Sequence, residues 1–268
     1  MTFNACIKKH FDEAFGPYGF KKIKSKYPYW GRMVGDEILQ IITYKNEWSM
    51  KPYKDFSIWG GVATVYRKKI DLDIAPRDQI WMQESRTIYE LINNTSFENY
   101  DSDNSFEENN EVDMEKSINN AISIARKGLL EELKQTNDIK SCVNFFNKYN
   151  SPMLSILCFD ELNNIKEDNE GILFFLNYNY EEYCDFKKIQ YQNSVNRLIE
   201  RYSLERSKDE DVDFKRICLD MEEVMKRSFE IFSRIKNNEK LYSKLENIAD
   251  RFKENNMRYF LEKGIIEK

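Results

Sequence analysis

Apolar residues recur with a helical period at the start of the chain. Over residues 3–15 they return at every fourth position, which places them on one face of an α-helix. Thr2 stands where an N-cap is expected, and Gly16-Pro17 predicts the end of the helix. The residues that form the apolar face are Phe3, Ile7, Phe11 and Phe15, with Ala14 three positions after Phe11 on the same face.

The next part of the chain has the composition and alternation of β-strands. Three segments are rich in β-branched and aromatic residues and are joined by short polar turns, a pattern that favours an antiparallel meander. The pair Gly60-Gly61 predicts a bulge or the close approach of another backbone. Residues 70–92 predict a short strand followed by a turn or short helix. The three strand segments are residues 19–34, 37–45 and 55–67, of which the second is expected at the centre of the sheet.

Helical periodicity returns at Met114 and continues with few interruptions. The predicted fold class is therefore α+β: an N-terminal helix on an antiparallel β-meander, followed by an all-helical C-terminal part. We expect an α+β domain over residues 1–113, ending in an acidic linker at 93–113. Residues 114–268 are expected to form a helical domain or helical extension. The predicted helical segments are 114–133, 139–149, 180–205, 210–236 and 238–263, with shorter apolar segments at 153–165 and 171–177.

The charge and the cysteine content restrict the classes of function and the cellular compartment that we expect. The net charge is −5, and residues 98–115 carry eight acidic residues and no basic one. A large basic surface for duplex nucleic acid is therefore not expected. No apolar run approaches the roughly 18 residues of a membrane span, and the first residues do not resemble a signal peptide. The five cysteines form no CxxC pair, which favours free thiols in the cytoplasm.

Candidate catalytic chemistry is sparse. The chain has a single histidine, His10, on the first predicted helix beside its apolar face, so chemistry that needs two histidines is excluded. Neither GxxxxGK[ST] nor GxGxxG occurs. Asp101 and Asp103 begin a pattern similar to a calcium loop, but Phe106 stands where that loop needs glycine. The sequence therefore predicts no cofactor and no metal site.

A short set of motifs resembles an uncharacterised bacterial domain family. Gly19-Phe20-Lys21-Lys22 is followed by Tyr29-Trp30-x-Arg32 and by a strand that closes on Gly61-Val62. The resemblance covers roughly residues 3–149. It implies an α+β fold in the bacterial cytoplasm and no reaction, cofactor or catalytic residue.

Three functions remain open. The first is a non-enzymatic protein-interaction module, such as an immunity or inhibitor protein, with an unidentified protein partner. Its partner-binding residues would be Trp48, Trp81, Lys22, Lys24, Lys26 and Trp30, although Trp30 also suits the core. The second is a carboxylate-based, metal-dependent hydrolase that uses Asp71, Asp73 and Glu84. The third is a binder of single-stranded nucleic acid, in which the lysines of residues 21–26 meet phosphates and Tyr27, Tyr29 and Trp30 stack on bases.

Overall fold

In the computed structural model the chain forms two compact units. The first comprises Met1–Val65, Ile70–Tyr149 and Asn256–Lys268, and the second comprises Tyr66–Lys69 and Asn150–Asn255. The structure describes residues 2–47, 51–67, 69–75, 82–93, 104–139, 141, 142, 145, 148, 230, 233 and 237–267. The segments predicted at 153–165, 171–177 and 180–205 lie outside the described residues, as do residues 210–229 of the helix predicted at 210–236.

An antiparallel sheet forms the centre of the first unit. Five strands are hydrogen-bonded in chain order, which confirms the predicted meander, and β3 lies between β2 and β4 as expected. The sixth strand, β6 (Ser105–Glu107), pairs with the beginning of β4 outside this series. The five strands are β1 (Lys21–Lys22), β2 (Tyr29–Val34), β3 (Ile38–Asn46), β4 (Tyr53–Thr64) and β5 (Met82–Glu84).

The first predicted strand, residues 19–34, is two strands. Lys22 pairs with Trp30, so the chain reverses between them and β1 runs antiparallel to β2. The Ser25 hydroxyl donates to the Tyr27 carbonyl at 2.7 Å within the connection. Pro28 precedes β2 and has no amide to donate to a ladder, which agrees with the break at this point.

The N-terminal helix forms as predicted. Helix α1 (Phe3–Phe15) is capped by Thr2, whose side chain accepts a hydrogen bond from the Ala5 amide at 3.4 Å. It ends where Gly16-Pro17 begins the short 3₁₀ turn η1 (Gly16–Tyr18). Its buried side chains, which include Cys6 and Phe11, face the sheet core.

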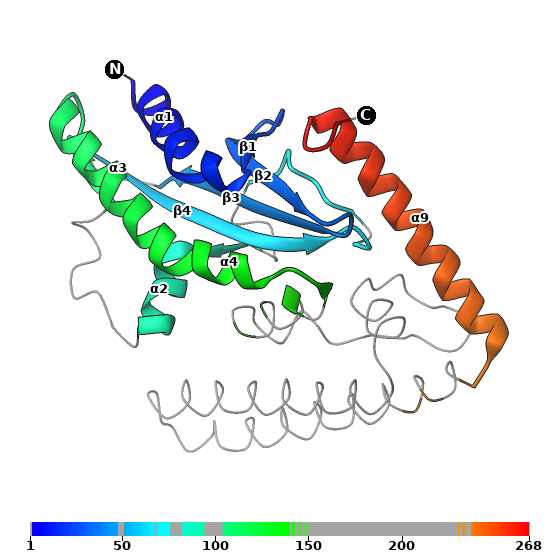
Figure 1. Cartoon of the computed structure of the whole chain (residues 1–268). Coiled ribbons are helices and arrows are strands. Elements are labelled where there is room, and N and C mark those ends of the chain that lie inside the picture. The colour runs from blue at the N-terminus through cyan, green and yellow to red at the C-terminus, as the bar shows by residue number, and fades with distance from the viewer. Residues whose placement is uncertain are drawn as a thin grey trace, which may run out of the picture. The chain divides into compact units, whose positions relative to one another are not determined.

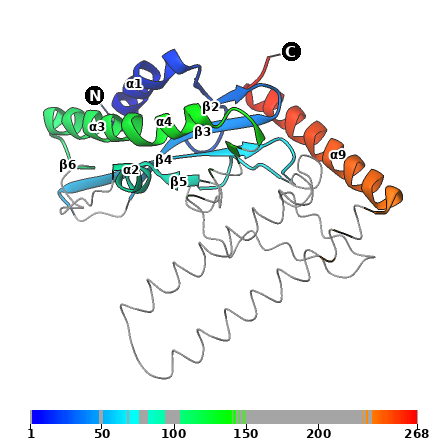
Figure 2. The same cartoon turned by 60° about the horizontal axis from the view of Figure 1, so that its bottom comes forward.

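A second run of helix packs beside α1 on the same face of the sheet (Figures 1 and 2). Helix α3 (Glu111–Ala125) continues through a π-helical segment, η3 (Arg126–Leu130), into α4 (Glu131–Gln135). The predicted stripe from Met114 to Leu133 is buried in one core with α1 and the sheet. Helix α2 (Ser85–Asn93) follows β5, as the sequence of residues 70–92 predicts. Residues on both sides of position 113 thus contribute to one core, and β6 and the first turn of α3 lie within the expected linker.

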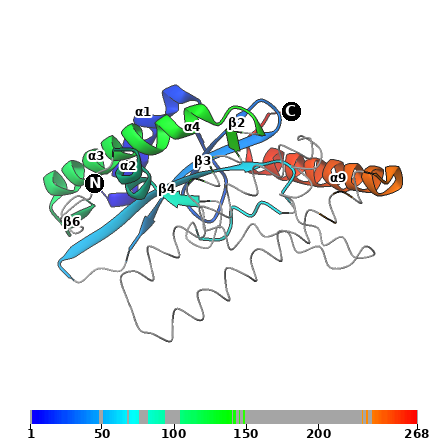
Figure 3. The same cartoon turned by 90° about the horizontal axis from the view of Figure 1, so that it is seen from below.

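The chain end belongs to the first unit. Helix α9 (Glu239–Lys263) corresponds to the helix predicted at 238–263. Its last residues lie beside β1 and β2 (Figure 3), where the Lys24 amide donates to the Lys263 carbonyl at 3.1 Å. The buried Asn256 side chain donates to the Val65 carbonyl at 2.8 Å. These bonds attach the C-terminal residues to the connection that follows β4 and to the connection between β1 and β2.

Candidate functional site

Trp30 is a core residue. It is 1% exposed and packs against Phe11, with ring centroids 4.7 Å apart. Its indole Nε1 donates to Asp12 Oδ1 at 2.7 Å, and Lys8 holds the other oxygen of that carboxylate at 2.6 Å. The indole is therefore not accessible to a protein partner or to a nucleic-acid base. Including Trp30 in the partner-binding surface was wrong, because its aromatic area is used to bury α1 on the sheet.

Two charged side chains contact the Trp30 indole: Asp12 accepts a hydrogen bond from its nitrogen, and Lys22 lies over its ring. The Lys22 ammonium lies 4.2 Å from the centroid of the Trp30 ring, although the side chain keeps contact with solvent. Partial burial lowers the pKa of Lys22 to about 8, the Asp12 carboxylate offsets only part of this, and Lys8 adds to the lowering. Burial raises the pKa of Asp12, but hydrogen bonds from Lys8 and Trp30 outweigh it and leave that pKa below its ordinary value.

The other predicted partner-binding residues are not brought together by the described contacts. Lys24 and Lys26 are exposed, and their backbone amides are used in docking the chain end. Trp48 and Trp81 lie outside the described residues. Tyr29 is fully buried, so it offers no stacking surface for a base. Of the three aromatic residues expected to stack on bases, Tyr29 and Trp30 are buried, and Tyr27, with Lys26 Nζ 5.5 Å from its ring centroid, is half-buried.

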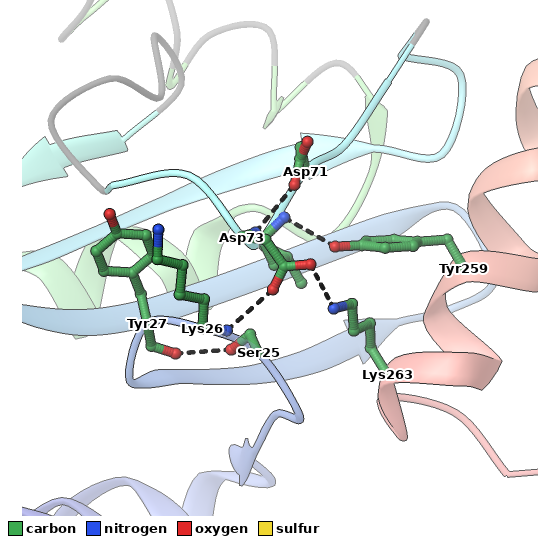
Figure 4. Close-up of polar contacts among 8 residues, drawn as sticks. Ser25, Lys26, Tyr27, Asp71, Asp73, Tyr259 and Lys263 are labelled. Atoms are coloured by element: carbon green, nitrogen blue, oxygen red, sulfur yellow. Dashed lines mark hydrogen bonds and ion pairs between the residues drawn. The ribbon is translucent and has the colours of Figure 1, made fainter.

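Asp71 and Asp73 serve the attachment of α9 (Figure 4). Asp73 Oδ2 pairs with Lys263 Nζ at 2.6 Å, and its Oδ1 accepts from the Lys26 amide at 2.9 Å. Asp71 Oδ1 accepts from the Asp73 amide at 3.0 Å, and the Tyr259 hydroxyl accepts from the Leu72 amide at 2.9 Å. The carboxylates therefore hold a turn and a helix end together.

The electrostatics of Asp73 do not match those of a general acid. Hydrogen bonds from Lys263 and from the Lys26 backbone hold the pKa of Asp73 below its ordinary value. A carboxyl that donates a proton near neutral pH needs the opposite shift. The side chain of Glu84, the third candidate of the hydrolase hypothesis, lies outside the described residues, although its backbone pairs with Trp59 in the sheet.

A surface groove lies between α1 and the helical run of α3 and η3. It encloses about 760 Å³. Its apolar lining residues are Ile122 and Leu130, which are buried, and the half-buried Ala14. Polar and charged side chains line the rest of it: His10, Glu13, Tyr18, Asn119, Ser123, Arg126, Lys127 and Glu131.

Charges of both signs surround the groove. Glu13 comes from α1, and Arg126 and Lys127 come from η3. Tyr18 lies between them, with Arg126 at 3.5 Å from its hydroxyl and Lys134 at 4.9 Å from its ring centroid. The same Lys134 pairs with Glu131 at 2.7 Å. The groove thus combines apolar lining residues with a rim that can complement either charge.

Among the residues that the structure describes, one group of metal-ligating side chains converges. Cys6, His10 and Glu115 each offer a ligand atom, and these atoms lie within 4.8 Å of one another. Cys6 is buried, His10 is half-buried and Glu115 is exposed. Burial raises the pKa of the Cys6 thiol, and the Glu115 carboxylate adds to the increase. The four-residue spacing of Cys6 and His10 was visible in the sequence, whereas the contribution of α3 was not.

Comparisons of the chain with protein-family models, curated proteins and solved structures found no match. The resemblance of residues 3–149 to an uncharacterised bacterial family therefore gains no support from them. In the described part of the chain, no helix has the length and apolar content needed to cross a bilayer. The arguments for function rest on the geometry of the first unit.

Proposed function

We propose that this protein is a non-enzymatic interaction module that binds a helix of a partner protein in the groove between α1 and α3. The observation that carries the proposal is the groove itself, with its 760 Å³ and its apolar lining residues Ala14, Ile122 and Leu130. An immunity or inhibitor protein would act in this way, by occupying a surface of its target.

The shape of the groove favours a helix as the bound element. Two neighbouring helices leave a furrow between their ridges of side chains, and a third helix packs its own ridge into such a furrow. Helix-in-groove recognition uses apolar residues at i, i+3 or i+4 and i+7 of the bound segment. An amphipathic partner helix would place these residues over Ile122 and Leu130.

Charge complementarity defines the partner further. Glu13 on one side of the groove would be complemented by a basic residue of the bound helix. On the other side, Arg126 and Lys127 would be complemented by an acidic residue. Such rim contacts contribute to specificity and association rate more than to affinity. The partner helix is therefore expected to carry opposite charges on its two flanks.

Binding is supported over catalysis by the state of the described carboxylates. Asp12 and Asp73 both have lowered pKa values and both accept hydrogen bonds from lysines within the chain. Each stabilises the fold in its present ionised form. The free, buried thiols of Cys6 and Cys142 support action in a reducing compartment such as the cytoplasm.

The test uses two adjacent asparagines of α3. Asn119 lines the groove, and Asn120 is an exposed residue of the same helix that does not line it. Asn119→Trp is expected to fill part of the groove and weaken partner binding, whereas Asn120→Trp leaves it unchanged. Both variants and the parent chain are used for affinity capture from a lysate of the source organism. A photo-crosslinking residue at position 123 then reports which segment of the partner occupies the groove.

The proposal stands if one protein is retained by the parent and by Asn120→Trp, is lost with Asn119→Trp, and is crosslinked at position 123 through an amphipathic segment. A partner retained equally by all three chains would place binding elsewhere and refute the role of the groove. Capture of nothing above background by any of them would count against an interaction module altogether.

A further inference from the structure

We propose that Cys6, His10 and Glu115 form a zinc site that joins α1 to α3. The inference is independent of the partner-binding proposal, because it rests on a different set of contacts. His10 also lines the groove, so the two sites are neighbours.

Helix geometry places two of the ligands on one face. Residues four apart on an α-helix lie one above the other, so Cys6 and His10 present a thiol and an imidazole toward the same neighbour. That neighbour is α3, which packs directly against α1 and supplies Glu115. The third ligand comes from a helix more than a hundred positions away in the sequence.

The imidazole has an unsatisfied nitrogen. Nε2 of His10 is buried and has no hydrogen-bond partner in the structure. Buried polar atoms are nearly always paired, because an unpaired one has lost its bonds to water without gaining others. A metal ion bound to the imidazole would remove this cost, because coordination uses the nitrogen lone pair. The one histidine of the chain thus has a buried nitrogen that a cation could bind.

The charges of the cluster also favour a divalent cation. The Glu115 carboxylate and the Cys6 sulfur lie within 4.8 Å of each other, so the cluster can present two negative charges to one ion. A Zn²⁺ ion bound by both groups would neutralise a thiolate and a carboxylate together. Calcium and magnesium take oxygen ligands, so a site with one sulfur and one nitrogen favours zinc.

The distances are close to those of a zinc site. Bonds of about 2.0–2.3 Å in tetrahedral geometry place ligand atoms roughly 3.3–3.8 Å from one another. The three ligand atoms lie within 4.8 Å of one another, so side-chain adjustments of about 1 Å would bring the set to these distances. Three protein ligands leave a fourth position, which water can fill from the solvent side of Glu115.

Zinc titration of the full chain tests the proposal. The protein is reduced, stripped of metal and titrated with Zn²⁺ by calorimetry, while proton NMR follows the imidazole signals. Because the chain has one histidine, those signals report on His10 without assignment. Cys142 is a poor competitor, because burial raises the pKa of its thiol to about 12. We expect one equivalent of Zn²⁺ to bind and to shift the imidazole signals.

Two variants and a control complete the test. Cys6→Ala is expected to weaken zinc binding at least about 100-fold, and Glu115→Gln about 10-fold or more. Glu115 is exposed, so its variant keeps the fold even if Cys6→Ala does not. Glu107→Gln, at an exposed glutamate of β6 outside the cluster, should bind zinc as the parent does. Absence of binding would overturn the proposal. So would binding that leaves the imidazole signals unmoved, since that metal would sit at other cysteines or at the acidic segment.

Discussion

At the scale of single residues, the polar side chains inside the fold carry information that the sequence hides. Gln40 occurs in the strand Ile38–Asn46 among β-branched residues, and nothing in that pattern separates it from a solvent-facing position. In the structure Gln40 is 1% exposed. Its amide nitrogen donates to the Thr136 carbonyl at 2.9 Å, and its oxygen accepts from Arg32 Nε at 2.8 Å. It connects β2, β3 and the end of α4.

Replacing Gln40 by leucine should therefore be costly. Gln40→Leu removes the amide group that donates to the Thr136 carbonyl and accepts from Arg32 Nε. The carbonyl and the guanidinium nitrogen each lose that hydrogen bond. We expect a loss of about 1–3 kcal/mol in the free energy of unfolding, measured by urea denaturation. Asn46→Leu, at the exposed end of the same strand, serves as the control and should change stability by less than about 0.5 kcal/mol. Equal effects of the two substitutions would contradict a structural role for the Gln40 bonds.

Lys22 gives a second prediction at this scale. With a pKa lowered to about 8, a much larger fraction of its amine is neutral near pH 7.5 than for an ordinary lysine. We expect amine-directed acetylation at that pH to modify Lys22 several-fold faster than the adjacent Lys21, as read by peptide mass spectrometry. Lys21 is a suitable reference, because it is also exposed and pairs with Glu267 at 3.1 Å. Equal rates at the two lysines would show that partial burial does not lower the pKa of Lys22.

At the scale of elements, local sequence patterns predict most of the secondary structure of the described residues. The period of the apolar residues locates α1, the α3 stripe and α9. β3 and β4 are buried on both faces over most of their length, so their dense β-branched and aromatic residues locate them instead. Residues 19–34 failed as a single strand because alternation continues across the turn, and only the pairing of Lys22 with Trp30 reveals the reversal. At Gly60-Gly61 the sequence predicts either a bulge or a close approach. The hydrogen-bonded register between β3 and β4 runs through both glycines without a bulge, so the close approach is the alternative that the structure favours. Leu129 of η3 packs over Gly60, so the approaching group is chiefly a side chain.

Gly60→Ala tests that contact. An added Cβ would collide with Leu129 Cδ2 and lie 2.9 Å from the Ile41 carbonyl oxygen, and the second of these is backbone that cannot move easily. We expect a loss of about 1–3 kcal/mol in the free energy of unfolding from overpacking. Gly31→Ala is the matched control in the same sheet: its Cβ would meet the flexible Cδ1 of Ile23 at 2.6 Å and backbone only at 3.5 Å. A control as destabilising as Gly60→Ala would mean that the Ile41 carbonyl oxygen is not what makes an added Cβ costly at position 60.

At the scale of the whole molecule, the candidate sites depend on contacts that sequence patterns do not encode. Cys6 and His10 are recognisable as neighbours on one helix, but Glu115 joins them only because α3 packs on α1. The groove has the same origin, because its lining comes from α1 and from the helical run that begins with α3. These helices pack together but are separated in the sequence by all the strands of the sheet. Asp71 and Asp73 were singled out for catalysis from their spacing alone. Their use in attaching α9 depends on Lys263, 190 residues further along the chain.

The attachment of the chain end through Asp73 should depend on pH. Because the pKa of Asp73 is lowered in the folded state, its contribution to stability is present above the ordinary value of about 3.9 and is lost as the pH falls through the lower, folded value. The Lys26 amide donates to Asp73 Oδ1 at 2.9 Å, so its NMR chemical shift reports the ionisation directly. We expect that shift to titrate with a midpoint below about 3.9. In Asp73→Asn the titration should disappear, and the Lys24 amide, which is bonded to the Lys263 carbonyl, should exchange with solvent faster at neutral pH. A midpoint at or above about 4 would show that Lys263 does not hold the carboxylate, and that the chain end is attached by Asn256 and Tyr259 without it.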